Sequence, residues 1–589
     1  MDYSRNVARG KKLKKVLVFL LLCCLSWSAH AAILNEKILD DDLYQQVLKK
    51  SGTTESDIKL YSQIFAAIKD NDVAKADKLV AKLHSKALMG HVLAQKYLSR
   101  DYKSSYKELT EWLKKYEDHP QHGTLSILAK TKAPGYKPAK PVPSKKKLYA
   151  SYAWYKDSYS SLKAEDRKFV RQKLDEFLRA IRKTDNKKAT AIMNDTRFRM
   201  TIPDKRYDGM SSTLAASYFY EGEYKQALKW TEKAVRRSHE TTAAWFGGLA
   251  AWKLGDYKKS ADLFEKLDSF NEEDQWLAAS GAFWAYRANE KLKNTEKAEK
   301  YLRKAASFER TFYGILARYQ LGRELDYDWK TQVFFNNTDN DEYRNEMLNS
   351  AVVRRAILLI KAGEADLAEA DLRKNYVKLN RKQKELVMFL SGQHSFANLS
   401  FLIANGLKNY AKSRSYDSYM YPYPDWEPEK RWTVNRSWVW ALVRQESLFN
   451  HKVRSYAGAC GLMQLMPYTA AAVTKNKEYK KGCKQLYDKG RNLQIGQDYV
   501  KILLDDENVG DNLFFLAASY NGGPHNVKKW VDRKNYENDP LLFVEMIPWR
   551  ETRLYVKKVV ANYWIYNSRR GKNSKSLKQL KKGEWPRLD

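Results

Sequence analysis

The sequence predicts a mainly α-helical protein with several domains. Between the N-terminal segment and the last third of the 589-residue chain, roughly 400 residues show almost none of the alternation that is typical of strands. Apolar residues recur there at helical spacing instead, and one segment pattern is repeated. The length of the chain predicts two to four domains. We therefore expect helices that are grouped into successive helical domains.

The first 31 residues have the pattern of a secretory signal peptide. Six basic residues precede the apolar run Val16–Leu25, and the Ala-His-Ala sequence at residues 29–31 provides a cleavage site between small residues. The apolar run is too short for an ordinary membrane span. We expect cleavage of residues 1–31, export to the periplasm, and no stable membrane span in the mature form. An uncleaved signal anchor is the alternative.

Residues 32–349 are expected to form an N-terminal α-superhelical solenoid. Gly222 and Gly255, and likewise Tyr224 and Tyr257, lie 33 positions apart within similar segments. This period is close to that of the helix-turn-helix tetratricopeptide repeat. Such hairpins bury their apolar faces only against their neighbours, which produces a solenoid. The prolines of residues 133–144 predict an extended connection within it.

A small helical linker domain is expected at residues 350–428. It ends in a segment that is broken by prolines, Tyr421–Pro428, where regular helix is disfavoured. The remaining domain, residues 429–589, contains the candidate functional residues.

Glu446 is the candidate catalytic residue. On a helix it shares a face with Leu442 and Val443, so its carboxylate projects from an apolar stripe. Burial disfavours the charged form and raises the pKa of a glutamate from about 4.3 toward neutrality. Such a carboxyl can hold a proton for a leaving group near neutral pH. The alternative is an ordinary helix glutamate that is paired with Arg444 or Lys452.

Three further blocks follow Glu446-Ser447 in order. They are Gly-Leu-Met-Gln at residues 461–464, Tyr-Asn-Gly-Gly at residues 520–523, and the segment from Glu545 to Val556 that contains Ile-Pro and Glu-Thr-Arg. Together the blocks resemble the soluble, slt-type lytic transglycosylases, a goose-lysozyme-like family. One position departs from the family pattern, because Gly522 stands where alanine is usual. The change is small and leaves the expected activity in place.

The resemblance implies a lysozyme-like catalytic transglycosylase domain at residues 429–589. It also implies cleavage of the bond between N-acetylmuramic acid and N-acetylglucosamine in peptidoglycan, with 1,6-anhydromuramoyl ends. Glu446 would act as general acid and then as base. On spacing alone, Met463 is predicted to be a core residue. The substrate-binding residues that the resemblance implies are Ser447 and Tyr520 near the carboxylate or acetamido group, Met463, Gln464 and Asn521 along the sugar subsites, and Glu545. For Glu545 a structural role is the favoured alternative.

The blocks offer no second carboxylate within a short loop of Glu446. Two-carboxylate glycoside hydrolysis is therefore disfavoured, and one group must act twice. Two alternatives stay open at this point. Water could replace the muramoyl hydroxyl as nucleophile, which would give a lysozyme-type hydrolase. The chain could also be a non-catalytic cell-wall-binding scaffold of tetratricopeptide-like repeats.

Cys460 and Cys483 are the two cysteines that remain after cleavage at residue 31. In an oxidising compartment they are a disulfide candidate, and two separate buried thiols are the alternative. His451 and His525 lack partners at metal-ligand spacing, so we assign no metal and no cofactor.

The formal net charge of +36 favours polyanionic partners. Export argues against nucleic acid and favours the glycan strands of peptidoglycan, whose lactyl and stem-peptide groups carry carboxylates. Proteins of cell-wall biosynthesis or division are further candidate partners.

Overall fold

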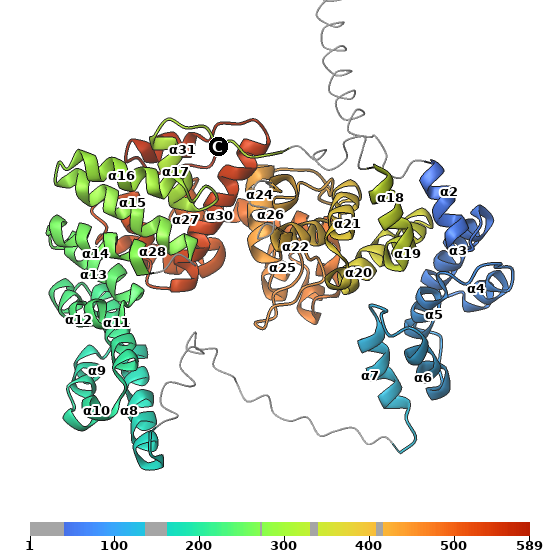
Figure 1. Cartoon of the computed structure of the whole chain (residues 1–589), viewed down its shortest axis with the longest axis horizontal. Helices are drawn as coiled ribbons and strands as arrows, with labels where there is room; N and C mark the ends of the chain where they lie inside the picture. Colours follow the sequence, from blue (N-terminus) through green and yellow to red (C-terminus); the bar gives the residue numbers. More distant parts are fainter. Residues whose placement is uncertain (1–40, 136–161, 271–273, 330–339, 408–415) are drawn as a thin grey trace, which may run out of the picture. The chain divides into compact units, whose positions relative to one another are not determined.

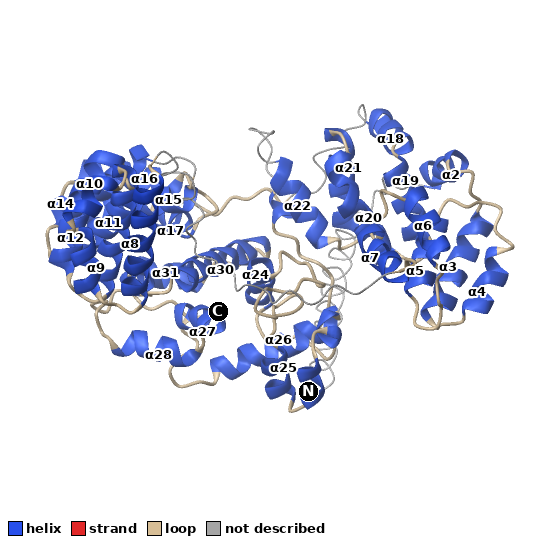
Figure 2. Cartoon of the chain, turned by 90° about the horizontal axis from the view of Figure 1, so that it is seen from below, coloured by secondary structure: helices blue, strands red, loops and turns tan. Residues whose placement is uncertain are grey.

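The computed structural model describes residues 41–135, 162–270, 274–329, 340–407 and 416–589. Every regular element in these ranges is a helix (Figure 2), and their only strand-like pairings are isolated β-bridges. The predicted mainly α-helical class is therefore confirmed. None of the described helices has the length and apolar character that a membrane crossing requires. The expected signal peptide at residues 1–31 lies outside the described ranges.

The chain divides into two compact units, each built from two separate stretches of sequence. One contains the described residues of Met1–Val142 and Asp328–Pro424, and the other contains those of Pro143–Tyr327 and Asp425–Asp589. The range predicted for the solenoid contributes to both units. The boundaries at residues 31, 349 and 428 stay predictions.

The first unit contains two sets of helices, one from each stretch of sequence: α2 to α7 and α18 to α23. The helices are α2 (Asp41–Lys50), α3 (Glu55–Lys69), α4 (Val73–Val80), α5 (Met89–Leu98), α6 (Tyr106–Lys115), α7 (His122–Lys132), α18 (Asn340–Asn349), α19 (Ala351–Lys361), α20 (Ala365–Asn375), η2 (Tyr376–Lys378), α21 (Arg381–Gln393), α22 (Ala397–Leu407) and α23 (Asp417–Met420).

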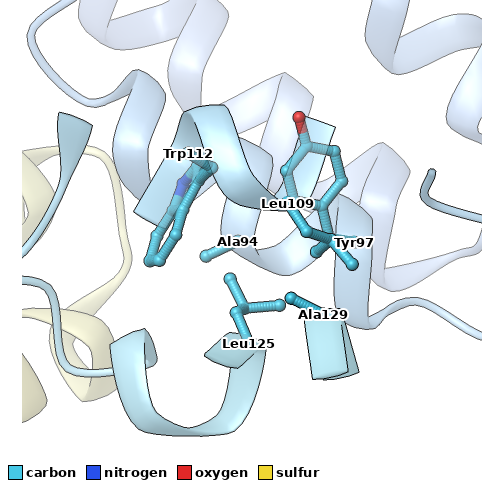
Figure 3. Close-up of a cluster of buried hydrophobic side chains, with 6 residues drawn as sticks. All are labelled: Ala94, Tyr97, Leu109, Trp112, Leu125 and Ala129. Carbon is cyan, nitrogen blue, oxygen red and sulfur yellow. The ribbon is translucent and has the colours of Figure 1, made fainter. Parts of the chain in front are cut away.

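The helices α5, α6 and α7 share an apolar cluster that includes Trp112, Leu109 and Leu125 (Figure 3). The indole of Trp112 also donates a hydrogen bond to the Gly90 carbonyl over 3.0 Å, which ties α6 to α5. The two stretches of this unit are joined by ion pairs such as Arg355 with Asp118, at 2.7 Å.

The first stretch of the second unit is a series of helical hairpins (Figure 1). Its helices are α8 (Ala164–Arg182), α9 (Asn186–Met193), α10 (Thr196–Thr201), α11 (Asp204–Tyr220), α12 (Tyr224–Ser238), α13 (Thr241–Lys253), α14 (Tyr257–Phe270), α15 (Gln275–Lys291), α16 (Thr295–Ala306) and α17 (Phe312–Gln320).

The repeat that the sequence predicts is visible in the turns of these hairpins. Gly222 follows α11 with a φ of 80°, and Gly255 follows α13 with a φ of 76°. Lys293 takes the equivalent place after α15 with a φ of 58°. A left-handed residue just beyond a helix end reverses the chain, and glycine adopts this conformation most easily. The predicted solenoid of hairpins is confirmed.

The second stretch of this unit contains the candidate site. Its helices are α24 (Arg436–Glu446), α25 (Pro467–Thr474), η3 (Lys477–Lys481), η4 (Lys484–Tyr487), α26 (Lys489–Leu504), α27 (Leu513–Gly522), α28 (Pro524–Asp532), α29 (Pro540–Met546), α30 (Arg550–Arg569) and α31 (Lys575–Lys581).

Helix α30 is the centre of this stretch, because both α24 and α27 pack against it. It also packs against the hairpin helices of the same unit. The Trp564 ring of α30 stacks on Phe312 of α17, with 5.1 Å between ring centroids. Phe514 of α27 joins the same cluster, 5.8 Å from Phe312. The helix that borders the site is thus also part of the contact with the solenoid hairpins.

Candidate active site

Glu446 is the last residue of α24, a helix whose preceding two turns are buried. Its side chain is half-buried at the helix end. Burial raises the pKa of Glu446 from 4.5 to about 7; a hydrogen bond from Tyr555 lowers the pKa in part, and the nearby negative charge of Glu551 raises it further. A carboxyl with this pKa is protonated in a large fraction of molecules near neutral pH. It can therefore donate a proton and later accept one.

Tyr555 of α30 contacts Glu446 directly. Its hydroxyl donates a hydrogen bond to Oε1 of Glu446 over 2.5 Å. Burial and the charge of Glu446 raise the pKa of Tyr555 well above 10. The tyrosine therefore stays protonated and serves as a donor that stabilises the carboxylate form of Glu446.

Two further tyrosines lie beside this pair. The hydroxyl of Tyr520 in α27 donates to the Met463 carbonyl over 2.8 Å, and its ring lies 5.5 Å from that of Tyr499 in α26. Burial is the largest cause of the raised pKa of Tyr520, and the charge of Glu446 adds to it. Tyr520 thus connects the Gly-Leu-Met-Gln turn to the neighbourhood of Glu446.

The Gly-Leu-Met-Gln turn is held by backbone hydrogen bonds and by one buried amide. Cys460 and Leu465 pair their backbones in both directions at 3.0 Å. Asn492 of α26 accepts from the Met463 N–H over 2.8 Å and donates to the Cys460 carbonyl over 3.1 Å. Gly461 has a φ of 79°, and a Cβ atom there would lie 2.2 Å from the Leu486 carbonyl oxygen. Only glycine fits this position.

The backbone reverses directly after Glu446. Leu448 and Phe449 have φ values of 48° and 64°, and Gln464 in the turn has a φ of 47°. Left-handed conformations are costly for bulky residues, and they concentrate at functional sites. Phe449 is buried against Trp440 and Trp426, so packing holds the reversal that ends α24.

The predicted site residues other than Glu446 fall into two groups. The first group comes together around the site. The Ser447 hydroxyl donates to the Val443 carbonyl over 3.1 Å, so it caps α24. The Gln464 amide donates to the Gly461 carbonyl over 2.8 Å. Asn521 accepts from the Thr552 hydroxyl over 2.6 Å. These contacts place the side chains but do not test their expected contacts with substrate.

The second group, Met463 and Glu545, lies in the core. Both side chains are fully buried, and the substrate contacts expected of them stay a prediction. The sulfur of Met463 packs against Gly496, where an added Cβ would lie 2.1 Å away. Glu545 forms an ion pair with Lys557 at 3.1 Å. The core position that the spacing of Met463 predicted is observed.

Two important residues were missed at the sequence level. Tyr555 lies in the quoted Glu-Thr-Arg block but 109 residues from Glu446, and no local pattern links the two. Asn492 is the first residue of the sequence Asn-Leu-Gln-Ile-Gly at residues 492–496, and its role depends on the turn that it holds. Tyr555 shares its helix face with Thr552 and Lys558, so it does not stand out from an apolar stripe as Glu446 does.

The cysteine pair is bonded. Cys460 and Cys483 form a disulfide with 5.7 Å between their Cα atoms. The bond connects the Gly-Leu-Met-Gln turn to the segment between η3 and η4. Within the ranges that the structure describes, no group of three or more His, Cys, Asp or Glu side chains is arranged to hold a metal ion.

Comparison with known proteins shows what the residues of this site are similar to. Residues 426–543 match the family model described as the transglycosylase SLT domain. The soluble lytic murein transglycosylase of Salmonella typhimurium is 29% identical over 365 residues, which are 61% of this chain and 53% of that protein. Its counterpart in Escherichia coli K12 is 29% identical over 344 residues, or 57% of this chain and 50% of that protein. The chain thus matches about half the length of these curated relatives.

Solved structures share the fold. The 70-kDa soluble lytic transglycosylase of Escherichia coli has a TM-score of 0.59 at 17% identity, with 88% of this chain and 97% of that chain covered. An inactive glutamate-to-glutamine mutant of the lytic transglycosylase Slt from Pseudomonas aeruginosa has a TM-score of 0.54 at 19% identity, with 87% and 97% covered. The resemblance that the sequence blocks carry is confirmed, and so is the all-α fold.

Proposed function

We propose, from the transglycosylase SLT domain that the chain carries at residues 426–543, that the protein is a lytic transglycosylase of peptidoglycan. It would cleave the β-1,4 bond between N-acetylmuramic acid and N-acetylglucosamine and leave 1,6-anhydromuramoyl ends. The observation that carries this proposal is Glu446, a carboxyl whose pKa is raised to about 7 and which receives a hydrogen bond from Tyr555.

The reaction uses the Glu446 carboxyl twice, first as an acid and then as a base. Glu446 first donates its proton to the glycosidic oxygen, the bond from that oxygen to C1 of the muramoyl residue breaks, and N-acetylglucosamine leaves as an alcohol. The muramoyl C6 hydroxyl then attacks C1 and gives its proton to the Glu446 carboxylate. The new C6–O–C1 bond closes the anhydro ring, and the acid is regenerated without water.

Tyr555 assists by stabilising the intermediate charge. When Glu446 has lost its proton, the hydrogen bond from the Tyr555 hydroxyl becomes a bond to an anion, which is stronger than a bond to a neutral carboxyl. This interaction increases as charge develops, which is the requirement for catalysis by differential binding.

The substrate contacts remain part of the proposal. Gln464, Asn521 and Tyr520 are half-buried around the site, so their side chains can reach a bound sugar in part. Ser447 is a weaker candidate, because its hydroxyl is buried and bonded to the backbone of α24. No cofactor is required by the reaction as written.

The location of the protein is also proposed. The signal-like residues 1–31 and the Cys460–Cys483 disulfide both fit an oxidising exported compartment, and the substrate of the proposed reaction lies in the periplasm. Partners from cell-wall biosynthesis or division stay a prediction, as do the domain boundaries.

Digestion of purified peptidoglycan sacculi tests this function. We expect the protein to release muropeptides with anhydromuramoyl ends, and we expect Glu446→Gln to release none. Glu478→Gln is the matched control, since Glu478 is an exposed glutamate of the same domain that pairs with Lys481. Reducing muramic acid ends would indicate a hydrolase instead. Binding of sacculi without any release by the unmodified protein would indicate a scaffold.

A further inference from the structure

Helix α30 presents two faces with different partners. Residues three or four apart lie on one face of a helix, whereas residues two apart point in nearly opposite directions. Thr552 and Tyr555 contact Asn521 and Glu446 at the site. The second face includes Arg553 and Lys557, and its partners are in α29 and the solenoid hairpins.

A buried polar network covers this second face. Lys557 pairs with Glu545 of α29 at 3.1 Å. Glu545 also accepts a hydrogen bond from the Tyr313 hydroxyl over 2.7 Å, and Tyr313 in turn accepts one from the indole of Trp284 over 2.9 Å. All four side chains are buried. The network therefore runs without interruption from α15 and α17 of the hairpins to α30.

Arg553 adds a second connection one turn earlier on α30. Its guanidinium donates to the Ile547 carbonyl over 2.6 Å and to the Tyr220 hydroxyl at the end of α11. It also lies over the ring of Phe246. Two turns of α30 are thus attached to the hairpins at points that share one face.

The partner helix α29 is held by the hairpins as well. Asp539 caps α29 by accepting the N–H groups of its first residues, and it receives a 2.6 Å ion pair from Arg287 of α15. The guanidinium of Arg287 lies over the rings of Trp252 and Trp284. Glu545 therefore projects from a helix whose start is fixed by the solenoid.

Such a network is a costly way to join helices. Removing charged groups from water has a large penalty, and apolar side chains of similar size would often give equal or greater stability. The polar network adds a constraint on how α30 is rotated about its axis. Hydrogen bonds require a particular distance and angle, whereas apolar contacts tolerate small rotations. Rotation of α30 about its axis moves the Tyr555 hydroxyl toward or away from Glu446.

We propose that Tyr313, Glu545 and Lys557 are positioning residues of the active site, through which the solenoid hairpins hold Tyr555 in hydrogen-bond contact with Glu446. This inference rests on the proposed function of Glu446 and adds the solenoid to its machinery. The contact is sensitive to position, because a donor that moves from 2.5 Å by about 1 Å no longer forms a good hydrogen bond.

The test is the pH dependence of kcat/KM for two kinds of variant. Tyr313→Phe removes one hydroxyl, and the paired change Glu545→Leu with Lys557→Met removes both charges so that neither is left unpaired. In each case we expect the alkaline limb of the profile to move to higher pH, by up to about one pH unit, since the lost hydrogen bond favours the charged form of Glu446. Thermal unfolding shows that each variant is folded at the assay temperature.

A double-mutant cycle separates positioning from general damage. Tyr555→Phe alone should shift the limb in the same direction. In the Tyr555→Phe background, Tyr313→Phe should produce no further shift. The matched control is Glu537→Gln, which removes an exposed ion pair with Lys253 of α13 and should leave the limb unchanged.

Three results would overturn the inference. In the first, the alkaline limb of kcat/KM stays at the same pH in both kinds of variant. In the second, Tyr313→Phe shifts the limb as far in the Tyr555→Phe background as it does alone. In the third, the Glu537→Gln control shifts the limb by the same amount. The titration of the Glu446 carboxyl carbon, followed by NMR with Glu446→Gln to assign it, reads the same pKa without turnover. If Glu446 proves not to be catalytic, the proposed function fails, but this titration still tests the positioning network.

Discussion

Glu446 combines two properties that oppose each other, burial and ionisation. Its position at the end of α24 removes water from the carboxyl, while the Tyr555 hydroxyl stabilises the anion once it forms. The result is a pKa of about 7, at which both protonation states are accessible. A single residue that must act as acid and then as base needs this balance.

The pH profile follows from the direction of this shift. The first step requires protonated Glu446, so kcat/KM should fall as pH rises through about 7, by about tenfold for each pH unit beyond it. Initial rates on sacculi or on a defined glycan, measured from pH 5 to 9 in constant ionic strength, provide the profile. A limb near pH 4.5 would mean that burial does not raise the pKa of Glu446 in solution.

The same pKa predicts a stability effect with a definite sign. The folded pKa is raised, so ionisation of Glu446 destabilises the native state; this cost is absent below pH 4.5 and complete above pH 7. Glu446→Gln should therefore increase the free energy of unfolding more at pH 8 than at pH 5, as measured by urea denaturation. Glu478→Gln is the control. An equal effect of Glu446→Gln at both pH values would contradict the assignment.

At the scale of elements, the Gly-Leu-Met-Gln turn depends on close packing between backbone segments. Gly461 meets the Leu486 carbonyl, Asn492 holds both sides of the turn, and the Cys460–Cys483 disulfide joins the same two segments. These contacts keep the Met463 carbonyl in place for Tyr520. The turn is therefore a rigid part of the site.

Gly461→Ala tests this packing. We expect a loss of more than about 1 kcal/mol in the free energy of unfolding, since alanine is strained at positive φ and its Cβ would meet backbone. Gly510→Ala is a matched control, because Gly510 has a φ of 55° with nothing within 4 Å of the added Cβ. The comparison isolates the steric contact. Equal losses in the two variants would show that the turn can adjust.

Removal of the disulfide should also lower stability. The two cysteines are separated by 23 positions, and closure of such a loop contributes about 3 kcal/mol in the chain-entropy model. The double variant Cys460→Ala with Cys483→Ala should therefore unfold at lower denaturant concentration than the oxidised protein. The reduced protein should resemble the variant. No difference between oxidised and reduced protein would contradict a stabilising disulfide.

Across the whole molecule, the sequence predicted the fold better than the site. Helical class and hairpins follow from local signals, such as the repeated Gly222 and Gly255 turns. Glu446 was found because its apolar neighbours lie on the same helix. Tyr555 and Glu545 are a different case, since they belong to one block of sequence but point to different surroundings.

The site was predicted less well because the sequence does not show what each face of a helix packs against. Glu545 on α29 and Tyr555 on α30 lie ten positions apart, but only tertiary packing determines that the first is buried beside Lys557 and the second meets Glu446. A block pattern identifies both as important without separating their roles. The substrate-binding role that the resemblance implies for Glu545 therefore stays a prediction beside its buried ion pair with Lys557.

The central claim is that one carboxyl, Glu446, closes the muramoyl ring without water. Digestion of sacculi in heavy-oxygen water, followed by mass analysis of the released muropeptides, tests it most directly. We predict products that are lighter by one water than hydrolysis products, that contain no solvent oxygen at C1, and that are absent with Glu446→Gln. Incorporation of heavy oxygen at the new muramoyl end, or release that persists with Glu446→Gln, would contradict the account.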